Sequence, residues 1–375
     1  MLNRSLSFFL SVLLFYCLSF TACSPNSKTD KSVAVSSKLP DTATALPPAP
    51  TLLNIVAVGD IMLGSAYKSE NDLPADHALG SFKHVKDFLK EGDVIFGNVE
   101  GCFLDSGAST KCKEKKNCVA FRMPESYAQV FKDAGFNLLS LANNHSGDFG
   151  STGRKTTLRR LEELDIKCGG LISHPSSILE VKGIKYGFCA FSPNEGTLSI
   201  YDYKNIATLI GDLKSKTDIV IVSFHAGGEG KAYQHVTRKT DFFYSEDRAN
   251  VYLFAHHAID SGADLVLGQG PHVTRAVEVY NKKFIAYSLG NFCTYGLFNL
   301  DGPNGYAPLM NIRITKEGDF MEATVHSVKQ TKLLGLMPDS ANRAFNRMLE
   351  LTNEDFPEHL LTFRDNSIYI KQVLQ

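Results

Sequence analysis

The chain has 375 residues, with 39 basic and 40 acidic side chains, a formal net charge of −1 and 43% hydrophobic residues. A charge this close to zero provides no broad basic surface, which excludes a protein dedicated to binding DNA or RNA. The hydrophobic fraction, which includes 10% aromatic residues, is too high for a mostly disordered chain. Composition therefore indicates a globular protein and leaves its chemistry open.

The N-terminus has the pattern of a bacterial export signal. Arg4 supplies a positive charge, and the apolar run over residues 6–20 is shorter than the roughly 20 residues that a membrane-spanning helix needs. The run ends in Phe20-Thr21-Ala22-Cys23, which resembles a lipobox with Phe20 in place of the usual leucine. We therefore expect residues 1–22 to be a lipoprotein signal peptide and Cys23 to be lipidated, which would make the protein an extracytoplasmic, membrane-anchored bacterial lipoprotein. The alternative is secretion with cleavage nearby and no lipid.

Residues 23–52 are predicted to form a disordered tether. The segment is rich in Ser, Thr, Ala, Lys and Pro, holds five of the 14 prolines and shows no apolar period. Such a composition cannot bury enough surface to offset the entropy lost on ordering. After the tether we expect one large domain over residues 53–335 and a C-terminal extension over residues 336–375 that packs on it. The extension is predicted to contain a helix and then a strand, over residues 341–351 and 367–373.

Three cysteines surround a lysine-rich stretch over residues 111–116, namely Cys102, Cys112 and Cys118. In an oxidising compartment we expect one local disulfide among them, and the sequence does not determine its pairing. The alternative, a zinc–thiolate site, is less favoured because the spacing lacks a CxxC pair. Buried, inert thiols are expected at three cysteines in or beside apolar runs, Cys168, Cys189 and Cys293.

From residue 52 onward, short β-branched runs alternate with helical patterns, which predicts an α/β fold. Apolar residues recur at helical spacing around residues 82–89, 127–131 and 157–164, the last with Thr157 as its expected N-cap. Six of the strand-like runs end in Asp, Asn, Glu or His close to glycine. In chain order, the polar residues near these ends are Asp60; Asn98 and Glu100; Asn143, Asn144, His145 and Asp148; His225 and Glu229; Gln269 and His272; and Asn291.

This series of strand ends predicts a metal site. In open α/β sheets, ligands bind outside the carboxyl ends of the strands. Mixed carboxylate, amide and imidazole groups suit a divalent ion such as Mn, Zn, Fe or Mg, and two ions about 3.5–4 Å apart would activate water against a phosphate-like centre. Each position taken alone is more commonly a turn or helix-capping residue, so the prediction depends on the whole series. By contrast, His256 and His257 lie in a helical stretch over residues 244–261, away from any strand end, and are expected to be structural or surface residues.

In order and spacing, these residues resemble the bacterial capsule-synthesis CapA (poly-γ-glutamate biosynthesis) family, which is similar to calcineurin-like metallophosphatases. The resemblance covers residues 53–295 and rests on six segments: Val58–Gly64, Gly97–Gly101, Leu141–Gly150, Ser223–Glu229, Gly262–Val273 and Tyr287–Phe292. It implies a four-layer α/β/β/α sandwich. It also implies an exported or membrane-attached protein that takes part in making a capsular or surface polymer.

The resemblance further implies roles for individual residues. The metal donors would be Asp60, Glu100, Asn144, His225 and His272. The catalytic residues would be His145 and Asp148, and the residues behind the metal or in contact with substrate would be Asn98, Glu229, Gln269 and Asn291. Family members often have His where this chain has Gln269, and Trp where it has Ala226. Because Gln is a weaker donor than His, both one ion and a weakly held pair remain open.

Three functions remain open from the sequence. The first is a metal-dependent hydrolase that acts on a phosphoester or another surface-polymer bond, with a metal-activated water as nucleophile and with His145 and Asp148 transferring protons. The second is a non-catalytic, membrane-tethered accessory that binds the polymer or a synthase or export complex. The third is a binding protein with a vestigial metal site, which Gln269 would explain. Likeness of fold does not choose among them.

Overall fold

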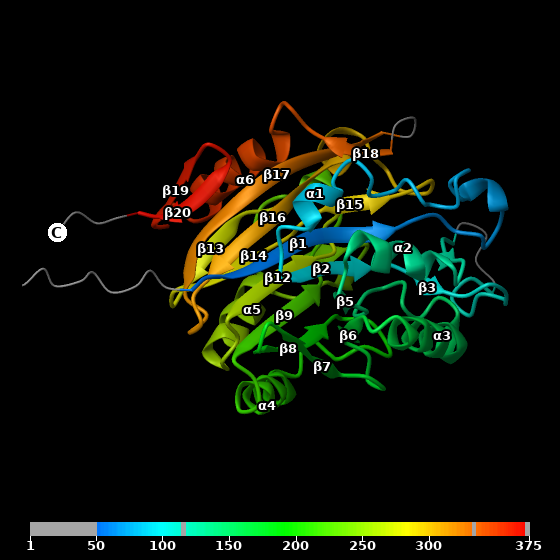
Figure 1. The fold of residues 1–375 in the computed structure, drawn as a ribbon, viewed down its shortest axis with the longest axis horizontal. Helices are drawn as coiled ribbons and strands as arrows, with labels where there is room; N and C mark the ends of the chain where they lie inside the picture. Colours follow the sequence, from blue (N-terminus) through cyan, green and yellow to red (C-terminus); the bar gives the residue numbers. More distant parts are fainter. Residues whose placement is uncertain (1–50, 114–117, 332–334, 372–375) are drawn as a thin grey trace, which may run out of the picture. The chain divides into compact units, whose positions relative to one another are not determined.

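Two β-sheets packed face to face lie at the centre of the folded part of the chain (Figure 1). The computed structural model describes residues 51–113, 118–331 and 335–371. The first sheet has 10 strands, and its main path runs in the order β19 (Leu361–Arg364), β20 (Ser367–Ile370), β17 (Phe320–Thr331), β16 (Tyr306–Ile314), β1 (Leu53–Met62), β2 (Val94–Val99), β5 (Leu138–Ser140) and β6 (Lys167–Gly169). Off this path, β15 (Asn291–Thr294) pairs with β1, and β18 (Gly335–Pro338) pairs with β17.

The second sheet has six strands, in the order β13 (Val277–Tyr280), β14 (Lys283–Ala286), β12 (Leu265–Gln269), β9 (Ile219–His225), β8 (Ile184–Phe191) and β7 (Ser176–Val181). Two short strand pairs lie outside both large sheets: β3 (Cys102–Phe103) with β4 (Arg122–Met123), and β10 (Phe242–Phe243) with β11 (Glu246–Asp247). Within each large sheet the central strands run parallel, so their carboxyl ends share one edge.

Helices cover the outer face of each sheet. The first sheet is covered by α1 (Lys86–Leu89), α2 (Tyr127–Ala134) and α3 (Gly150–Glu163). The second is covered by α4 (Tyr203–Lys214), α5 (Val251–Asp260) and the C-terminal end of α6 (Arg343–Asp355). Three short 3₁₀ helices lie in the loops: η1 (Glu70–Asp72), η2 (Lys231–Tyr233) and η3 (Gly302–Gly305).

The side chains of β1 show how this layering follows from the sequence. Ile55 and Ala57 belong to the core between the two sheets, whereas Val56 and Val58 belong to the core under the helices of the first sheet. Successive residues of a strand point to opposite faces, so a run that is apolar throughout is buried on both sides. The predicted four-layer α/β/β/α sandwich is therefore confirmed.

Three of the predicted helices begin elsewhere than expected. α3 starts at Gly150, and Thr157 lies inside it rather than at its cap. The Thr157 hydroxyl donates to the Gly153 carbonyl and accepts from the Phe103 N–H, each at 2.9 Å. The helical stretch predicted from residue 244 is regular only from Val251, as α5. It begins there because the Asn250 side chain accepts from the Leu253 N–H at 3.0 Å. The helix expected around residues 82–89 is regular only over α1.

The C-terminal residues add one helix and further strands to the first sheet. α6 occupies most of the segment predicted as helical, and its Phe345 and Met348 side chains enter the core between the sheets. β20 occurs within the predicted strand 367–373 and pairs with β17. β19, which was not predicted, forms a hairpin with β20.

The expected local disulfide is present and joins Cys112 to Cys118. Cys102 is a free, buried thiol, so the alternative zinc–thiolate site is not formed. The three cysteines expected to be inert, Cys168, Cys189 and Cys293, are also free and buried. Burial raises the pKa of Cys168 and of Cys293 to about 12, which keeps both thiols protonated and unreactive.

The predicted signal peptide, the lipidated Cys23 and all but the last two residues of the tether lie outside the described residues. None of the helices in the described ranges has the length and apolar character that crossing a membrane requires.

Candidate metal centre

Asp60 reaches the carboxyl edge of the first sheet at a point where only glycine can precede it. It pairs with Asn98 of β2 on one side and with Asn291 of β15 on the other. Its backbone N–H donates to the Gly290 carbonyl at 2.9 Å. A Cβ on Gly59 would collide with that carbonyl, so the close approach requires glycine. The strand register also shifts on both sides of Asp60, and such bulges re-aim side chains toward functional sites.

The second sheet supplies two imidazoles. His225 is the last residue of β9 and pairs with Gln269 at the end of β12. His272 follows β12 in a backbone conformation with φ of 59°, which costs a non-glycine residue about 1–3 kcal/mol. Contacts on both sides hold it there, since its Nδ1 lies 3.1 Å from Asn291 Oδ1 and its carbonyl accepts from Asn304 Nδ2 at 3.4 Å.

Four of these side chains meet where the edges of the two sheets come together. Asp60, Glu100, His225 and His272 each present one ligand-type atom within 4.8 Å of the others. His272 Nδ1 lies 3.0 Å from Asp60 Oδ2, and its Nε2 lies 3.5 Å from Glu100 Oε1. His225 Nε2 lies 3.6 Å from the same Glu100 oxygen and 4.0 Å from Asp60 Oδ1. Asp60, Glu100 and His225 are fully buried. The sequence predicted these four residues as donors, and we call them the metal cluster.

The charges of the cluster stabilise one another. Burial by itself would raise the pKa of Glu100, but the imidazoles of His272 and His225 lower that pKa to about 2. Burial by itself would lower the pKa of His272, but the carboxylates of Glu100 and Asp60 raise that pKa to about 10. At neutral pH, in the absence of a cation, the cluster therefore holds an ionised Glu100 and a protonated His272.

The hydrogen bonding of the cluster is incomplete. Within the described residues, both Glu100 carboxylate oxygens and both His225 ring nitrogens are buried and make no hydrogen bond, and the buried Asp60 Oδ2 has only its ion pair with His272 Nδ1. A buried polar group left unpaired costs about 1–3 kcal/mol, so this many in one place indicates a missing ligand. Two carboxylates and two imidazoles suit Mn, Zn or Fe better than Mg, which prefers oxygen donors. The residues present therefore fit a divalent cation.

Two amides predicted near the metal lie beside the cluster. Asn144 follows β5, and its buried Oδ1 makes no hydrogen bond with the described residues. Gln269 is fully buried and donates from Nε2 to the Val58 carbonyl at 3.2 Å, while its Oε1 is unpaired in the same way. The described residues contain one group of at least three His, Cys, Asp or Glu side chains with metal-binding spacing. That group accounts for one ion, and a second would depend on these amide oxygens.

A chain of amides connects the cluster to the loop after β5. Asn98 Nδ2 donates to Asp60 Oδ1 at 2.8 Å, and Asn143 Nδ2 donates to Asn98 Oδ1 at 3.1 Å. Asn143 Oδ1 in turn accepts from the His145 N–H at 3.1 Å. The sequence placed Asn143 at a strand end and gave it no role. In the structure, Asn143 connects the His145 backbone to the Asp60 carboxylate through Asn98.

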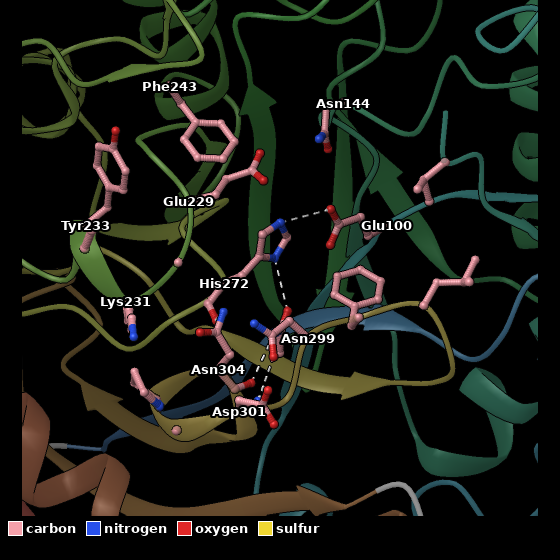
Figure 2. A pocket seen from close by; sticks show the side chains of 18 of the residues that line it. Glu100, Asn144, Glu229, Lys231, Tyr233, Phe243, His272, Asn299, Asp301 and Asn304 are labelled. Carbon is pink, nitrogen blue, oxygen red and sulfur yellow. Dashed lines mark hydrogen bonds and ion pairs between the residues drawn. The ribbon is translucent and has the colours of Figure 1, made fainter. Parts of the chain in front are cut away.

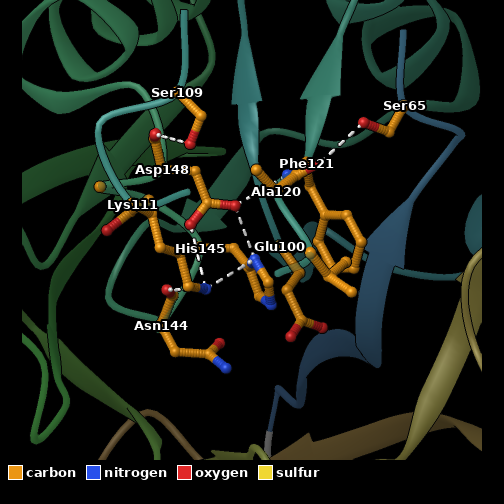
Figure 3. A network of polar contacts seen from close by, with 12 residues as sticks. Ser65, Glu100, Ser109, Lys111, Ala120, Phe121, Asn144, His145 and Asp148 are labelled. Atoms are coloured by element: carbon orange, nitrogen blue, oxygen red, sulfur yellow. Dashed lines mark hydrogen bonds and ion pairs between the residues drawn. The ribbon is translucent and has the colours of Figure 1, made fainter. Parts of the chain in front are cut away.

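His145 and Asp148 form a buried pair beside the cluster (Figure 3). His145 Nδ1 lies 2.7 Å from Asp148 Oδ2, which also accepts from the Phe121 N–H at 2.7 Å. The Phe121 ring stacks on the imidazole with centroids 4.0 Å apart. Lys111 Nζ lies 3.1 Å from Asp148 Oδ1. These contacts fix the ring with Nδ1 toward Asp148, which leaves Nε2 as the nitrogen available to a substrate.

Lys111 and Phe121 were not predicted as site residues. Both come from the segment between β3 and β4, which carries the disulfide. The sequence contained one indication, since Lys111 opens the lysine-rich stretch that interrupts the α/β pattern.

A cavity of about 960 Å³ opens beside the cluster (Figure 2). Glu100, Asn144, His145 and His272 all line it. Its other walls carry aromatic and polar side chains, among them Tyr233, Phe243, Phe298, Asn299, Asp301 and Asn304. Glu229, predicted to stand behind the metal or to contact substrate, lies in the cavity wall outside the metal cluster, where its carboxylate accepts from Arg248 Nη1 at 2.8 Å.

His256 and His257, expected to be structural or surface residues, lie on α5 away from this site. His256 Nε2 lies 2.9 Å from a Glu278 oxygen, and its ring stacks on Tyr280. His257 Nε2 lies 2.9 Å from the Tyr203 carbonyl. Both imidazoles are thus engaged in packing contacts.

The family model described as "Bacterial capsule synthesis protein PGA_cap" matches residues 54–295, more than half of the chain. The chain belongs to the PGA_cap family. The matched range contains the whole metal cluster together with His145 and Asp148. The predicted family resemblance is therefore confirmed.

Curated relatives of this PGA_cap chain include two Bacillus proteins. "Capsule biosynthesis protein CapA" of Bacillus anthracis is 30% identical over 263 residues, which cover 64% of this chain and 59% of that protein. "PGA biosynthesis protein CapA" of Bacillus subtilis is 28% identical over 258 residues, which cover 64% of this chain and 63% of that protein. The match thus spans less than two-thirds of each relative. Among solved structures, a putative 5'-nucleotidase from Staphylococcus aureus in complex with alpha-ketoglutarate matches at 12% identity with a TM-score of 0.41, over 77% of this chain and 53% of that chain.

Proposed function

We propose that this PGA_cap protein is a metal-dependent hydrolase in the biosynthesis of a capsular or other surface polymer of the poly-γ-glutamate type, and that it acts on a phosphoester or polymer bond. One observation carries the proposal: Glu100 and His272 of the metal cluster line the same cavity as His145, the imidazole that Asp148 orients. A site that combines cation ligands with an oriented imidazole has the parts that hydrolysis needs.

The chemistry follows from where these groups lie. A divalent cation held by Asp60, Glu100, His225 and His272 would supply positive charge that acidifies water and stabilises the negative charge formed during hydrolysis. His145, when doubly protonated, can donate from Nε2 to the leaving group. Asp148 accepts from Nδ1, so it orients the ring and stabilises the imidazolium.

Turnover and metal content of variants test the hydrolase proposal. The chain is loaded with Mn, Zn or Fe and assayed on a phosphomonoester, a phosphodiester and a γ-glutamyl peptide. We expect at least one substrate to be hydrolysed, and we expect Asp60→Ala and His225→Ala to lose both bound metal and turnover. His84→Ala removes an exposed imidazole and serves as the matched control, which should retain both. Absence of turnover on all three substrates with metal-loaded protein would overturn the proposal.

We also propose that the protein works outside the cytoplasm, anchored to the membrane by a lipid on Cys23. The sequence Phe20-Thr21-Ala22-Cys23 after the short apolar run supports this proposal. Metabolic labelling with a fatty acid, followed by cell fractionation, tests it. The chain should carry label and sediment with membranes, and Cys23→Ser should do neither. An unlabelled wild-type chain in the soluble fraction would contradict the proposal.

A second candidate function is a non-catalytic accessory with a vestigial metal site, which binds the polymer or a synthase or export complex. Gln269 favours it, because this residue stands at the end of β12 beside His225 with an amide in place of a stronger imidazole donor. Surface-polymer production in cells separates the two functions. If Asp60→Ala and His225→Ala both support normal production, the accessory function is favoured over hydrolysis.

A further inference from the structure

A second cavity opens on the other side of the His145–Asp148 pair. Its volume is about 440 Å³, and it shares Asn144 with the larger cavity over the metal cluster. Its walls carry two basic side chains, Lys111 and Arg154. Neither residue belongs to the metal cluster. A substrate bound at the cluster could therefore extend past Asn144 into a pocket that carries Lys111 and Arg154.

Arg154 is held in place yet keeps donors unused. It lies on α3, and a Cβ on either Gly147 or Gly196 would collide with its guanidinium, so these two glycines leave the space that it fills. Nη2 donates to the Glu195 carbonyl at 2.7 Å. Nη1 makes no hydrogen bond with the described residues and is not buried, whereas Nε is unpaired but buried. A fixed guanidinium with free donors suits the planar, two-oxygen recognition of carboxylate or phosphate.

The remaining charges of the pocket leave room for an anion. Lys111 Nζ lies 3.1 Å from Asp148 Oδ1 and donates to the Asn144 carbonyl at 3.2 Å, so the buried carboxylate is already neutralised. Glu195 also lines the pocket, but it is exposed to solvent, which screens its charge. Asn194 also lines the pocket, and its side-chain amide can donate to an anion.

We propose that the Arg154 pocket binds an oxyanion, a carboxylate or a phosphate, carried by the substrate unit next to the bond at the metal cluster. The proposal rests on the proposed function for the identity of the reacting bond, whereas anion binding itself needs no turnover.

Direct binding measurements test the proposal. A γ-linked glutamate trimer and tripolyphosphate are titrated calorimetrically into the chain in the Asp60→Ala background, in metal-free buffer, so that an ion at the cluster cannot contribute. Arg154→Gln should weaken binding of at least one probe by about 10- to 100-fold, because hydrogen bonds between charged groups are lost. Lys155→Gln removes the same charge from an exposed neighbour on α3 and should change affinity less than about twofold.

A further variant distinguishes loss of the anion site from misfolding, and the two probes distinguish a carboxylate from a phosphate. Arg154→Lys keeps the charge without the two-pronged geometry and should bind weakly with an unchanged melting temperature, which excludes misfolding as the cause. Loss confined to the trimer would identify a carboxylate, and loss confined to tripolyphosphate would identify a phosphate. Binding of neither probe, or equal losses in Arg154→Gln and Lys155→Gln, would overturn the proposal. A lack of turnover would count only against the hydrolase.

Discussion

His272 shows how a proton can take the place of a cation in the candidate site. Its backbone adopts φ of 59°, which places the ring between Asp60 and Glu100 at 3.0 and 3.5 Å. Those carboxylates raise the pKa of His272 to about 10 against the effect of burial. The imidazolium therefore offsets part of the negative charge that a divalent cation would otherwise balance. Metal binding must displace this proton, because only a neutral imidazole donates to a metal.

Metal affinity should consequently depend on pH. Below pH about 10, where His272 is protonated, each unit rise in pH is expected to strengthen apparent affinity by about tenfold. Glu100 adds nothing to this slope above pH about 2, because it is already ionised. Calorimetry in buffers of different ionisation enthalpy should detect about one proton released per ion. His272→Gln should abolish that release, and an affinity independent of pH near neutrality would contradict the prediction.

A different result is expected when the proton-transfer residue is removed. His145 lines the cavity but does not belong to the metal cluster. His145→Ala should therefore lower kcat by about 10²- to 10⁴-fold, the usual contribution of a general acid or base, with metal content unchanged. Steady-state kinetics and elemental analysis of the same preparation check both parts. Loss of bound metal in this variant would show that His145 acts as a ligand.

At the scale of elements, the site depends on how closely the strands approach. β1 and β15 meet at Gly59 and Gly290, where the Asp60 N–H donates to the Gly290 carbonyl. The identity of residue 59 therefore controls both the spacing of these strands and the position of the first metal donor.

Gly59→Ala tests both roles of this glycine, and a second glycine-to-alanine variant controls for the change in backbone preference. The added Cβ collides with backbone that cannot move aside, so we expect a loss of about 1–3 kcal/mol or more in the free energy of unfolding, together with weaker metal binding. Gly211→Ala is the control, because this exposed residue of α4 has open space around it. It should stabilise the chain by about 0.5–1 kcal/mol. Chemical denaturation measures both, and a Gly59→Ala chain as stable as wild type would contradict the collision.

The elements show which parts of the site the sequence could predict. Asp60 and Glu100 end neighbouring strands of one sheet, His225 and His272 those of the other, and the edge rule for parallel strands predicts each pair. The meeting of the two pairs follows from the sandwich that the family resemblance implied. Lys111 and Phe121 were missed because the β3–β4 segment reaches Asp148 only through long-range packing. The start of α3 was missed because Thr157 can bond its hydroxyl inside a helix as well as at a cap. β19 was missed because its few residues gain stability only from pairing with β20.

At the scale of the whole molecule, the metal cluster lies between the two sheets. Asp60 and Glu100 come from the first sheet, and His225 and His272 come from the second. A cation shared by all four would therefore link the two halves of the sandwich at the edge where the cavity opens. The same edge carries the His145–Asp148 pair and, beyond Asn144, the Arg154 pocket. The metal cluster, the proton-transfer pair and the anion pocket would thus lie in that order along a single edge of the molecule.

The central claim is that these four side chains hold a divalent cation. Anomalous X-ray diffraction from crystals of the metal-loaded chain, recorded at the absorption edge of Mn, Zn or Fe, tests it most directly. We predict a strong anomalous peak within bonding distance, about 2.0–2.3 Å, of donor atoms from Asp60, Glu100, His225 and His272. We predict no peak there in crystals of His225→Ala. A peak at another place in the molecule, or none in metal-loaded wild-type crystals, would contradict the assignment of the cluster as a metal site.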